Sequence, residues 1–422
     1  MTASISKFTL EHGSTSDLLI SDLLLGWNEF EKRHGRREFC DFNVSGHNLS
    51  KTYNSYDEIK FDLDKAFDAQ DVQACPITMK RLISLQEHFN IRTNRNGVDL
   101  KNHHFKAIGF TPTMIDEKII KSLRVQYEEA AQNAGISPFS FSKQQIQKDV
   151  IIPKNKIETQ LQDFFKDGKK QIEALTGAAA NFSVKYDIRS APNETWYWWI
   201  DGYKRQLKLS INTHYTKDAA LSELYVSAHH ELSGHGIYYS YMADRLGIET
   251  AQPPKNKDPI HSGITTVIGP EVVAAEAVAE IVPTFLEATK NKIMLADTAY
   301  SYYRRAVLNN ICATYKYHGA DAMYEYGMQN TDIEEENLHN LLKTRVKNFE
   351  TGLVELSYIP VYGAVHFMFR QALDYLPRED FKSILKTCYL NYLLPEDLNA
   401  LMKEKGVPEH ALLNTDNPAL TL

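Results

Sequence analysis

The first 150 residues carry a helical pattern of hydrophobic and polar positions. Apolar side chains recur every three or four residues in the segments 18–33, 56–69 and 114–134, which is the spacing of one face of an α-helix. Polar stretches such as 94–97 separate these segments, and we find no catalytic pattern among them. We therefore predict an N-terminal helical region over residues 1–150.

The pattern changes after Pro153. Apolar residues at helical spacing begin at Ile157, and Gly177 marks the end of that helix, because glycine readily adopts the left-handed conformation that ends many helices. The segments 182–189 and 207–212 then alternate apolar and polar residues, which is typical of strands with one buried face. A small sheet is therefore expected in the second part of the chain.

An aromatic segment lies between the two predicted strands. Residues 196–200 read Trp-Tyr-Trp-Trp-Ile and hold three of the four tryptophans. Such side chains either line a cleft or pack a strand against the core, and the sequence favours neither.

Two long helices are expected next. The first begins at Thr216, whose side chain can cap it, and ends at Gly247. The second begins near Pro270, since proline is favoured in the first turn of a helix. The pattern beyond residue 290 is helical, with no repeat of fixed period. The predicted fold class is mainly α with a small β-sheet (α+β).

Composition and charge exclude several classes of protein. Of 422 residues, 43% are hydrophobic and 24% are charged, which is the balance of a globular chain with a sizeable core. The formal net charge of −7 argues against nucleic acid as a partner. The most apolar stretch, 272–286, contains two glutamates, so we expect neither a membrane span nor a membrane partner.

The expected location is cytoplasmic. The first ten residues have no basic start followed by an apolar run, so they do not read as a secretory signal. The four cysteines are too few and too scattered for a disulfide framework in a chain of this length, which favours a reducing compartment. Export by a route without an N-terminal signal stays open.

The most informative motif is His230-Glu231-Leu232-Ser233-Gly234-His235 on the first long helix. In the common HExxH pattern of zinc hydrolases, two histidines four residues apart face one ion. The spacing of five found here would separate His230 and His235 by about 140° on a regular helix. A one-residue π-bulge restores a common face, and Gly234 would let the backbone distort.

A zinc site of this kind needs a third protein ligand and an open position for water. Glu276 and Glu280 lie four residues apart on one face of an otherwise apolar helix, where a carboxylate must be paired, neutralised or bound to metal. We predict Glu276 as the third ligand and Glu280 as an acceptor for a ligand imidazole N–H. Glu271 is the alternative third ligand, although its place at a helix start also suits a residue that complements the helix dipole.

This arrangement predicts metal-assisted hydrolysis. Glu231 follows the first ligand without being one, and it is the candidate general base that accepts a proton from water. The strand 207–212 lies just upstream of the metal-binding helix and is expected to hold an extended peptide by edge pairing.

The sequence resembles the tubulin-tyrosine carboxypeptidase-like metallopeptidases and their bacterial relatives. The resemblance rests on the strand–helix order, the HExxxH motif, the later glutamate and the α-rich C-terminal third, and it covers residues 150–405. It implies a gluzincin-like core in which His230, His235 and Glu276 bind one zinc ion per chain and Glu231 is the catalytic base.

Two other families are more remotely similar. Dipeptidyl-peptidase III is similar at residues 230–235 and 276–280, but its pattern has an additional Glu and an Arg where this chain has Ala275 and Val278. The thermostable HExxH carboxypeptidases look alike at residues 208–215 and lack the inserted residue.

A carboxypeptidase must also recognise the terminal carboxylate of its substrate, usually with Arg or Lys. The candidates are Lys343, Arg345 and Lys347, where the resembling family has a basic cluster, and Arg304, Arg305 and Arg370. A polar–aromatic group is a candidate oxyanion stabiliser, with a packing role as the alternative: Tyr358, Tyr362 and His366.

The sequence thus favours a zinc metallopeptidase whose catalytic domain spans residues 151–422 and whose substrate is a peptide or protein C-terminus. A dipeptidyl-peptidase or an endopeptidase of the same zinc class is an alternative, and so is an inactive metallopeptidase fold used as a binding module. A carboxylate-bridged di-metal oxidase is disfavoured, because it needs a Glu-x-x-His motif on two helices and only one helix here combines His with Glu.

Overall fold

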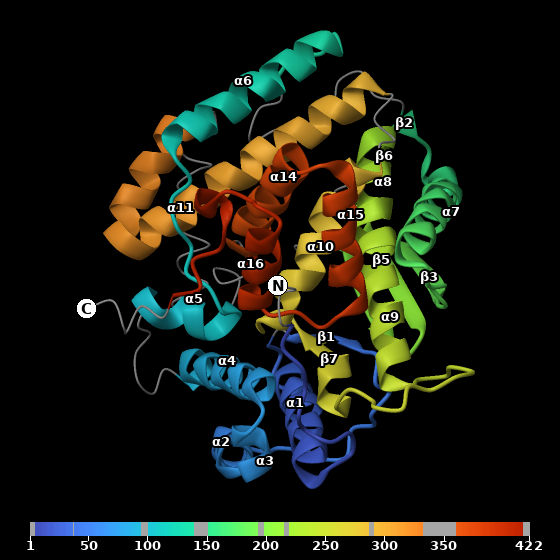
Figure 1. Cartoon of the computed structure of the whole chain (residues 1–422), viewed down its shortest axis with the longest axis vertical. Helices are drawn as coiled ribbons and strands as arrows, with labels where there is room; N and C mark the ends of the chain where they lie inside the picture. Colours follow the sequence, from blue (N-terminus) through green and yellow to red (C-terminus); the bar gives the residue numbers. More distant parts are fainter. Residues whose placement is uncertain are drawn as a thin grey trace.

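The computed structural model describes residues 5–36, 38–93, 100–138, 151–192, 198–214, 219–286, 291–331 and 360–416. It is mostly helical with a small mixed sheet, which confirms the predicted α+β class (Figure 1). No helix within the described ranges is both long enough and apolar enough to span a membrane.

The first part of the chain forms helices close to the three predicted segments, and three further helices, α3, α4 and α5, that were not singled out. Ser14 caps the first by accepting a hydrogen bond from the Asp17 N–H, and Ser55 caps the second by accepting one from the Glu58 N–H. The helices are α1 (Thr15–Arg33), α2 (Tyr56–Asp68), α3 (Gln70–Gln73), α4 (Pro76–Thr93), α5 (Leu100–Ile108) and α6 (Glu117–Asn133). The polar stretch 94–97 lies outside the described residues.

The second part contains the remaining helices of the described ranges. They are α7 (Ile157–Thr176), α8 (Leu221–Ser227), α9 (Ile237–Leu246), α10 (Glu271–Phe285), α11 (Lys292–Asn330), α14 (His366–Tyr375), α15 (Arg378–Leu390) and α16 (Pro395–Glu404). Two π-helical segments, η2 (Ala228–Gly236) and η4 (Val361–Val365), join these helices, and single 3-10 turns are η1 (Lys154–Lys156), η3 (Ile260–Gly263) and η5 (Glu409–Ala411). Gly177 and Gly247 end α7 and α9 in the left-handed conformation, as predicted.

The five-stranded sheet has the order β3-β5-β4-β1-β7. Its strands are β1 (Cys40–Asn43), β3 (Ser183–Arg189), β4 (Trp198–Tyr203), β5 (Gln206–Asn212) and β7 (Ile264–Thr266), while β2 (Ile151–Ile152) and β6 (Ala219–Ala220) form a separate pair. Strand β5 runs parallel to β3 and antiparallel to β4. The expectation that 207–212 offers a free edge to a peptide is therefore wrong, because both of its edges are already paired.

The structure also gives the outcome for two further predicted segments, the first long helix and the aromatic segment. The first long helix begins at Leu221 instead of Thr216, since Ala219 and Ala220 pair with β2 and residues 215–218 are not described. Of the aromatic segment, Trp198 and Trp199 are half-buried on β4, and the Trp198 Nε1–H donates to Glu223 Oε1 over 3.3 Å.

Helix α10 forms the centre of the second part (Figure 1), packed against η2, α14 and α15. Every residue of α10 except Thr284 is buried, in agreement with its apolar sequence. Strand β1 comes from the N-terminal region but pairs with β4 and β7, which come from the second part. The division at residue 150 stays a prediction.

Candidate metal centre

The HExxxH motif lies in the π-helical segment η2, which confirms the predicted bulge. A Cβ on Gly234 would stand 2.5 Å from the Ala279 Cα of α10. Glycine is thus required here for the close approach of the two helices, in addition to any freedom it gives the backbone. The Tyr389 hydroxyl donates to the Ser233 carbonyl over 2.6 Å and so satisfies one carbonyl of the bulged turn.

The bulge brings both histidines to one carboxylate. His230 Nε2 lies 3.7 Å from Glu276 Oε2, and His235 Nε2 lies 3.3 Å from Glu276 Oε1. The three potential ligand atoms all lie within 4.8 Å of one another, and within the described part of the chain they are the group that could hold a metal ion. Two imidazole nitrogens and one carboxylate oxygen match the ligand sets of catalytic zinc sites.

Glu276 and His235 stabilise each other's charged forms. Burial alone would lower the pKa of His235, but the Glu276 carboxylate raises it to about 9. Burial would likewise raise the pKa of Glu276, and the charge of His235 lowers it below its ordinary value. A metal ion bound here would take the place of the proton on the imidazole.

Glu280 lies behind the first histidine of the motif. Its Oε1 lies 3.4 Å from His230 Nδ1, while its Oε2 lies 3.0 Å from His366 Nδ1 and 2.6 Å from Arg305 Nε. Burial would raise the pKa of Glu280, but the Arg305 charge and the His366 hydrogen bond lower it to about 2. Glu280 is thus an ionised acceptor, and an acceptor at His230 Nδ1 leaves Nε2 of that ring to face Glu276.

Glu231 is half-buried beside the first histidine. Burial raises its pKa, and so do the charges of Glu276 and Glu280, against the opposing effect of His230 and His235. A carboxylate with a raised pKa is better suited to accept a proton near neutral pH.

The neighbouring buried groups are turned away from this cluster. Glu271 accepts a hydrogen bond from Thr266 Oγ1 over 3.0 Å and lies 3.3 Å from Arg81 Nη2, and it lies outside the group that could hold a metal ion. His229 Nδ1 lies 3.1 Å from Ser233 Oγ, and burial lowers its pKa to about 3. Of the adjacent pair of histidines, only His230 belongs to the candidate site.

The remaining predicted residues are only partly accounted for. His366 is buried against Glu280, its ring stacks on Tyr302 at 5.2 Å, and its Nε2 has no hydrogen-bond partner in the described part of the structure. Tyr362 is half-buried in η4, with the Arg305 guanidinium 4.5 Å from its ring centre. Their role in stabilising an oxyanion stays a prediction. Lys343, Arg345, Lys347 and Tyr358 lie outside the described residues.

Sequence reasoning did not find the partners that hold Glu280. Arg305 appeared only as a candidate for binding substrate, and Tyr302 was not singled out. One signal was available in the sequence, because a buried carboxylate requires a compensating cation. In the structure, a Cβ on Gly363 of η4 would stand 2.5 Å from Asn309 Cβ of α11. The contact at Gly363 brings α14 with His366 close to the segment of α11 that carries Arg305.

Comparison with protein-family models finds no match, and comparison with curated proteins finds none either. Among solved structures, a putative lipoprotein from Colwellia psychrerythraea is similar with a TM-score of 0.47 and 10% sequence identity, over 86% of this chain and 66% of that one. Trypanosoma cruzi metallocarboxypeptidase 1 is similar with a TM-score of 0.45 and 12% identity, over 93% of this chain and 96% of that one. Likeness at this level assigns neither a family nor an activity to the chain.

Proposed function

We propose that this protein is a zinc-dependent peptidase, and specifically a carboxypeptidase. The observation that carries the proposal is the convergence of His230, His235 and Glu276, with all three potential ligand atoms within 4.8 Å. Such a set supplies three of four zinc ligands and leaves one position open for water and substrate. Zinc bound there would polarise a peptide carbonyl and lower the pKa of water towards ~7.

The protein's own residues would bind the ion, orient its ligands and transfer the proton. His230 and His235, whose Nε2 atoms face Glu276, would hold the ion together with Glu276, and Glu280 would orient the His230 ring through Nδ1. Glu231 accepts the proton of the attacking water and returns it to the amine that leaves. The raised pKa of Glu231 supports this role.

One cation favours a carboxypeptidase over an endopeptidase. Arg305 is paired with Glu280, but Arg370 lies one helical turn beyond His366 on α14. A substrate whose C-terminus reaches this side of the site would find positive charge there. A dipeptidyl-peptidase, an endopeptidase and an inactive binding module are the alternatives.

Peptide cleavage tests the proposal. The zinc-loaded protein is incubated with matched peptides whose C-termini are free or amidated, and the products are identified by mass spectrometry. We expect single residues to be released from the free form only, because the terminal carboxylate positions the substrate. Equal cleavage of both forms would indicate an endopeptidase, and N-terminal dipeptides would indicate a dipeptidyl-peptidase. Zinc binding without any cleavage would indicate a binding module.

A further inference from the structure

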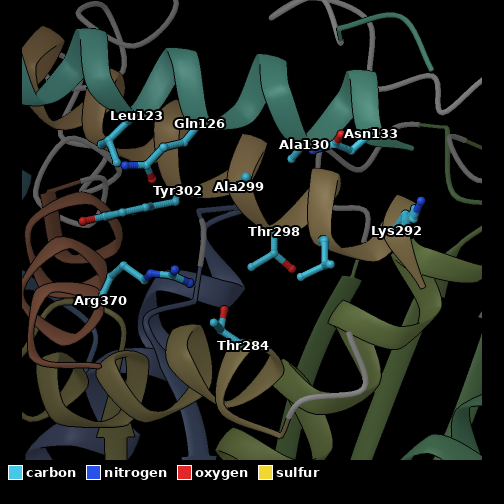
Figure 2. A pocket seen from close by; sticks show the side chains of 11 residues that line it. Leu123, Gln126, Ala130, Asn133, Thr284, Lys292, Thr298, Ala299, Tyr302 and Arg370 are labelled. Carbon is cyan, nitrogen blue, oxygen red and sulfur yellow. The ribbon is translucent and has the colours of Figure 1, made fainter. Parts of the chain in front are cut away.

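A cavity lies near the candidate metal centre, on the side of Glu280. It has a volume of about 260 Å³ and opens between α6 and α11 (Figure 2). Leu123 and Ala130 of α6 lie opposite Ala299 of α11, and Arg370 of α14 points into the cavity. Leu295 of α11 also lines it. The N-terminal region thus supplies one wall of this cavity.

Two helices connect the cavity to the metal centre. Along α10, Glu276, Glu280 and Thr284 follow one another at intervals of four residues, so they lie near one face of the helix. Thr284 is the one residue of α10 that is not buried, and it lines the cavity. On α14, His366 beside Glu280 is likewise followed four residues later by Arg370. The cavity therefore begins about one helical turn, ~6 Å, beyond Glu280.

Two cations, Arg370 and Lys292, line the cavity, and none of the described residues that line it is acidic. Arg370 is paired with Asp374, which is not among the lining residues. The Arg370 guanidinium lies 5.7 Å from the centre of the Tyr302 ring, and its Nε donates to Asp374 Oδ2 over 3.2 Å. Within the described residues, its two Nη groups have no hydrogen-bond partner. A guanidinium fixed at Nε with both Nη groups available is suited to bind a carboxylate.

We propose that this cavity binds a carboxylate with a small apolar body, and that Arg370 is the partner of the carboxylate group. Its volume is equal to that of roughly nine water molecules, at ~30 Å³ each, which suits one amino-acid side chain with its carboxylate or a short fatty acid. The ligand is either the C-terminal residue of a substrate peptide or a free carboxylic acid. The first source rests on the proposed peptidase function, and the second does not.

Binding of hexanoate, measured by calorimetry on the full-length protein with and without zinc, tests the cavity. We expect hexanoate to bind in both states, hexanamide not to bind, and Arg370→Gln to weaken hexanoate binding about 10- to 100-fold. Lys292→Gln removes the same charge at the far end of the lining (Figure 2) and should have a smaller effect. The proposal would be overturned if hexanoate bound in only one of the two zinc states or if hexanamide bound as tightly as hexanoate. It would also be overturned if Arg370→Gln bound hexanoate as tightly as the wild type. Arg370→Lys and the zinc content of each variant control for misfolding.

A second set of measurements distinguishes the two sources of the carboxylate, a peptide C-terminus and a free carboxylic acid. Ala130→Phe fills the cavity from α6, away from the metal ligands, and should abolish hexanoate binding. If a peptide C-terminus is the occupant, hexanoate inhibits hydrolysis competitively and Arg370→Gln raises KM more than it lowers kcat. If hexanoate binds and does not compete with peptide, the occupant is a free carboxylic acid. If no peptide is hydrolysed at all, the peptidase proposal fails, while the hexanoate titration still decides the fate of the cavity proposal.

Discussion

The first turn of α10 and its middle both bury carboxylates, and they balance the charge in different ways. Glu271 lies beside Arg81, whose guanidinium also donates to the backbone carbonyls of His261 and Ile264. Glu276 faces two imidazoles at 3.3 and 3.7 Å. Arginine keeps its charge at every physiological pH, whereas an imidazole can exchange its proton for a metal ion.

We therefore interpret Glu271 as a structural acid and Glu276, in the same helix, as the functional acid of the proposed site. Arg81 balances the charge of Glu271 and also ties the turn before β7 to α4, so that carboxylate has a permanent cation beside it. In the proposed site, a metal cation would replace the proton that Glu276 and His235 share. Burial and residue type are the same for both glutamates, and only the chemistry of the partner distinguishes them.

The largest expected effect is at Glu276. Glu276→Ala should reduce the zinc content from about one ion per chain to almost none and abolish hydrolysis, because two ligands alone leave the site incomplete. Zinc is measured by elemental analysis after dialysis. His235→Ala should behave in the same way. If Glu276→Ala kept about one zinc ion per chain, Glu276 would not be a ligand of the proposed site.

Glu231→Gln should separate catalysis from metal binding in the same cluster. The amide has nearly the shape of the carboxylate but cannot accept the proton of water, so we expect turnover to fall about 10²- to 10⁴-fold with zinc retained. Steady-state kinetics and zinc content are measured on the same preparation. Turnover within a few-fold of the wild type would exclude Glu231 as the base.

Arg81→Met should damage the structural cluster and spare the metal centre. It leaves Glu271 buried without its cation, which typically costs about 3–5 kcal/mol of stability. Chemical denaturation measures this loss, and zinc binding should persist below the transition. The double variant Arg81→Met/Glu271→Gln is the control, since removing the orphaned charge should restore part of the stability. If the folded Arg81→Met variant lost zinc, the Glu271 cluster and the Glu276 cluster would not be independent of each other.

The smallest of these effects is expected at Glu280. Glu280→Gln keeps an acceptor near His230 Nδ1 but loses its charge, so we expect zinc affinity to fall about 10- to 100-fold without unfolding. A competition titration with a chelator measures it. Glu379→Gln, an exposed acid on α15, is the matched control. Equal zinc affinity in both variants would place Glu280 outside the site.

The grouping of His230, His235 and Glu276 could be predicted because its signals are local. The five-residue spacing of His230 and His235 required a bulge if both were to face one ion, and Glu276 and Glu280 were conspicuous in an apolar helix. The helix ends at Gly177 and Gly247 could be predicted equally well, because each end depends on the glycine at the terminus itself.

The features that sequence reasoning missed depend on long-range contacts. Strand β1 is four residues long and is stabilised by partners far along the chain, so its sequence carries little signal. Strand β5 was recognised as a strand, but whether it lies at an edge depends on β3 and β4. Arg305 reaches Glu280 from another helix, which no spacing in the sequence reveals.

The position of β1 also determines the order in which the molecule can be completed during synthesis. Its neighbours in the sheet begin at Trp198 and Ile264, and Phe42 stacks on Tyr239 at 3.8 Å, so these surfaces emerge from the ribosome long after β1 does. Until then, the nascent N-terminal segment exposes an unpaired strand and apolar side chains, which are the features that chaperones recognise and that promote aggregation. Contacts between such distant segments also slow folding. Residues 1–150 made alone should therefore aggregate, and supplying residues 151–422 during refolding should rescue them.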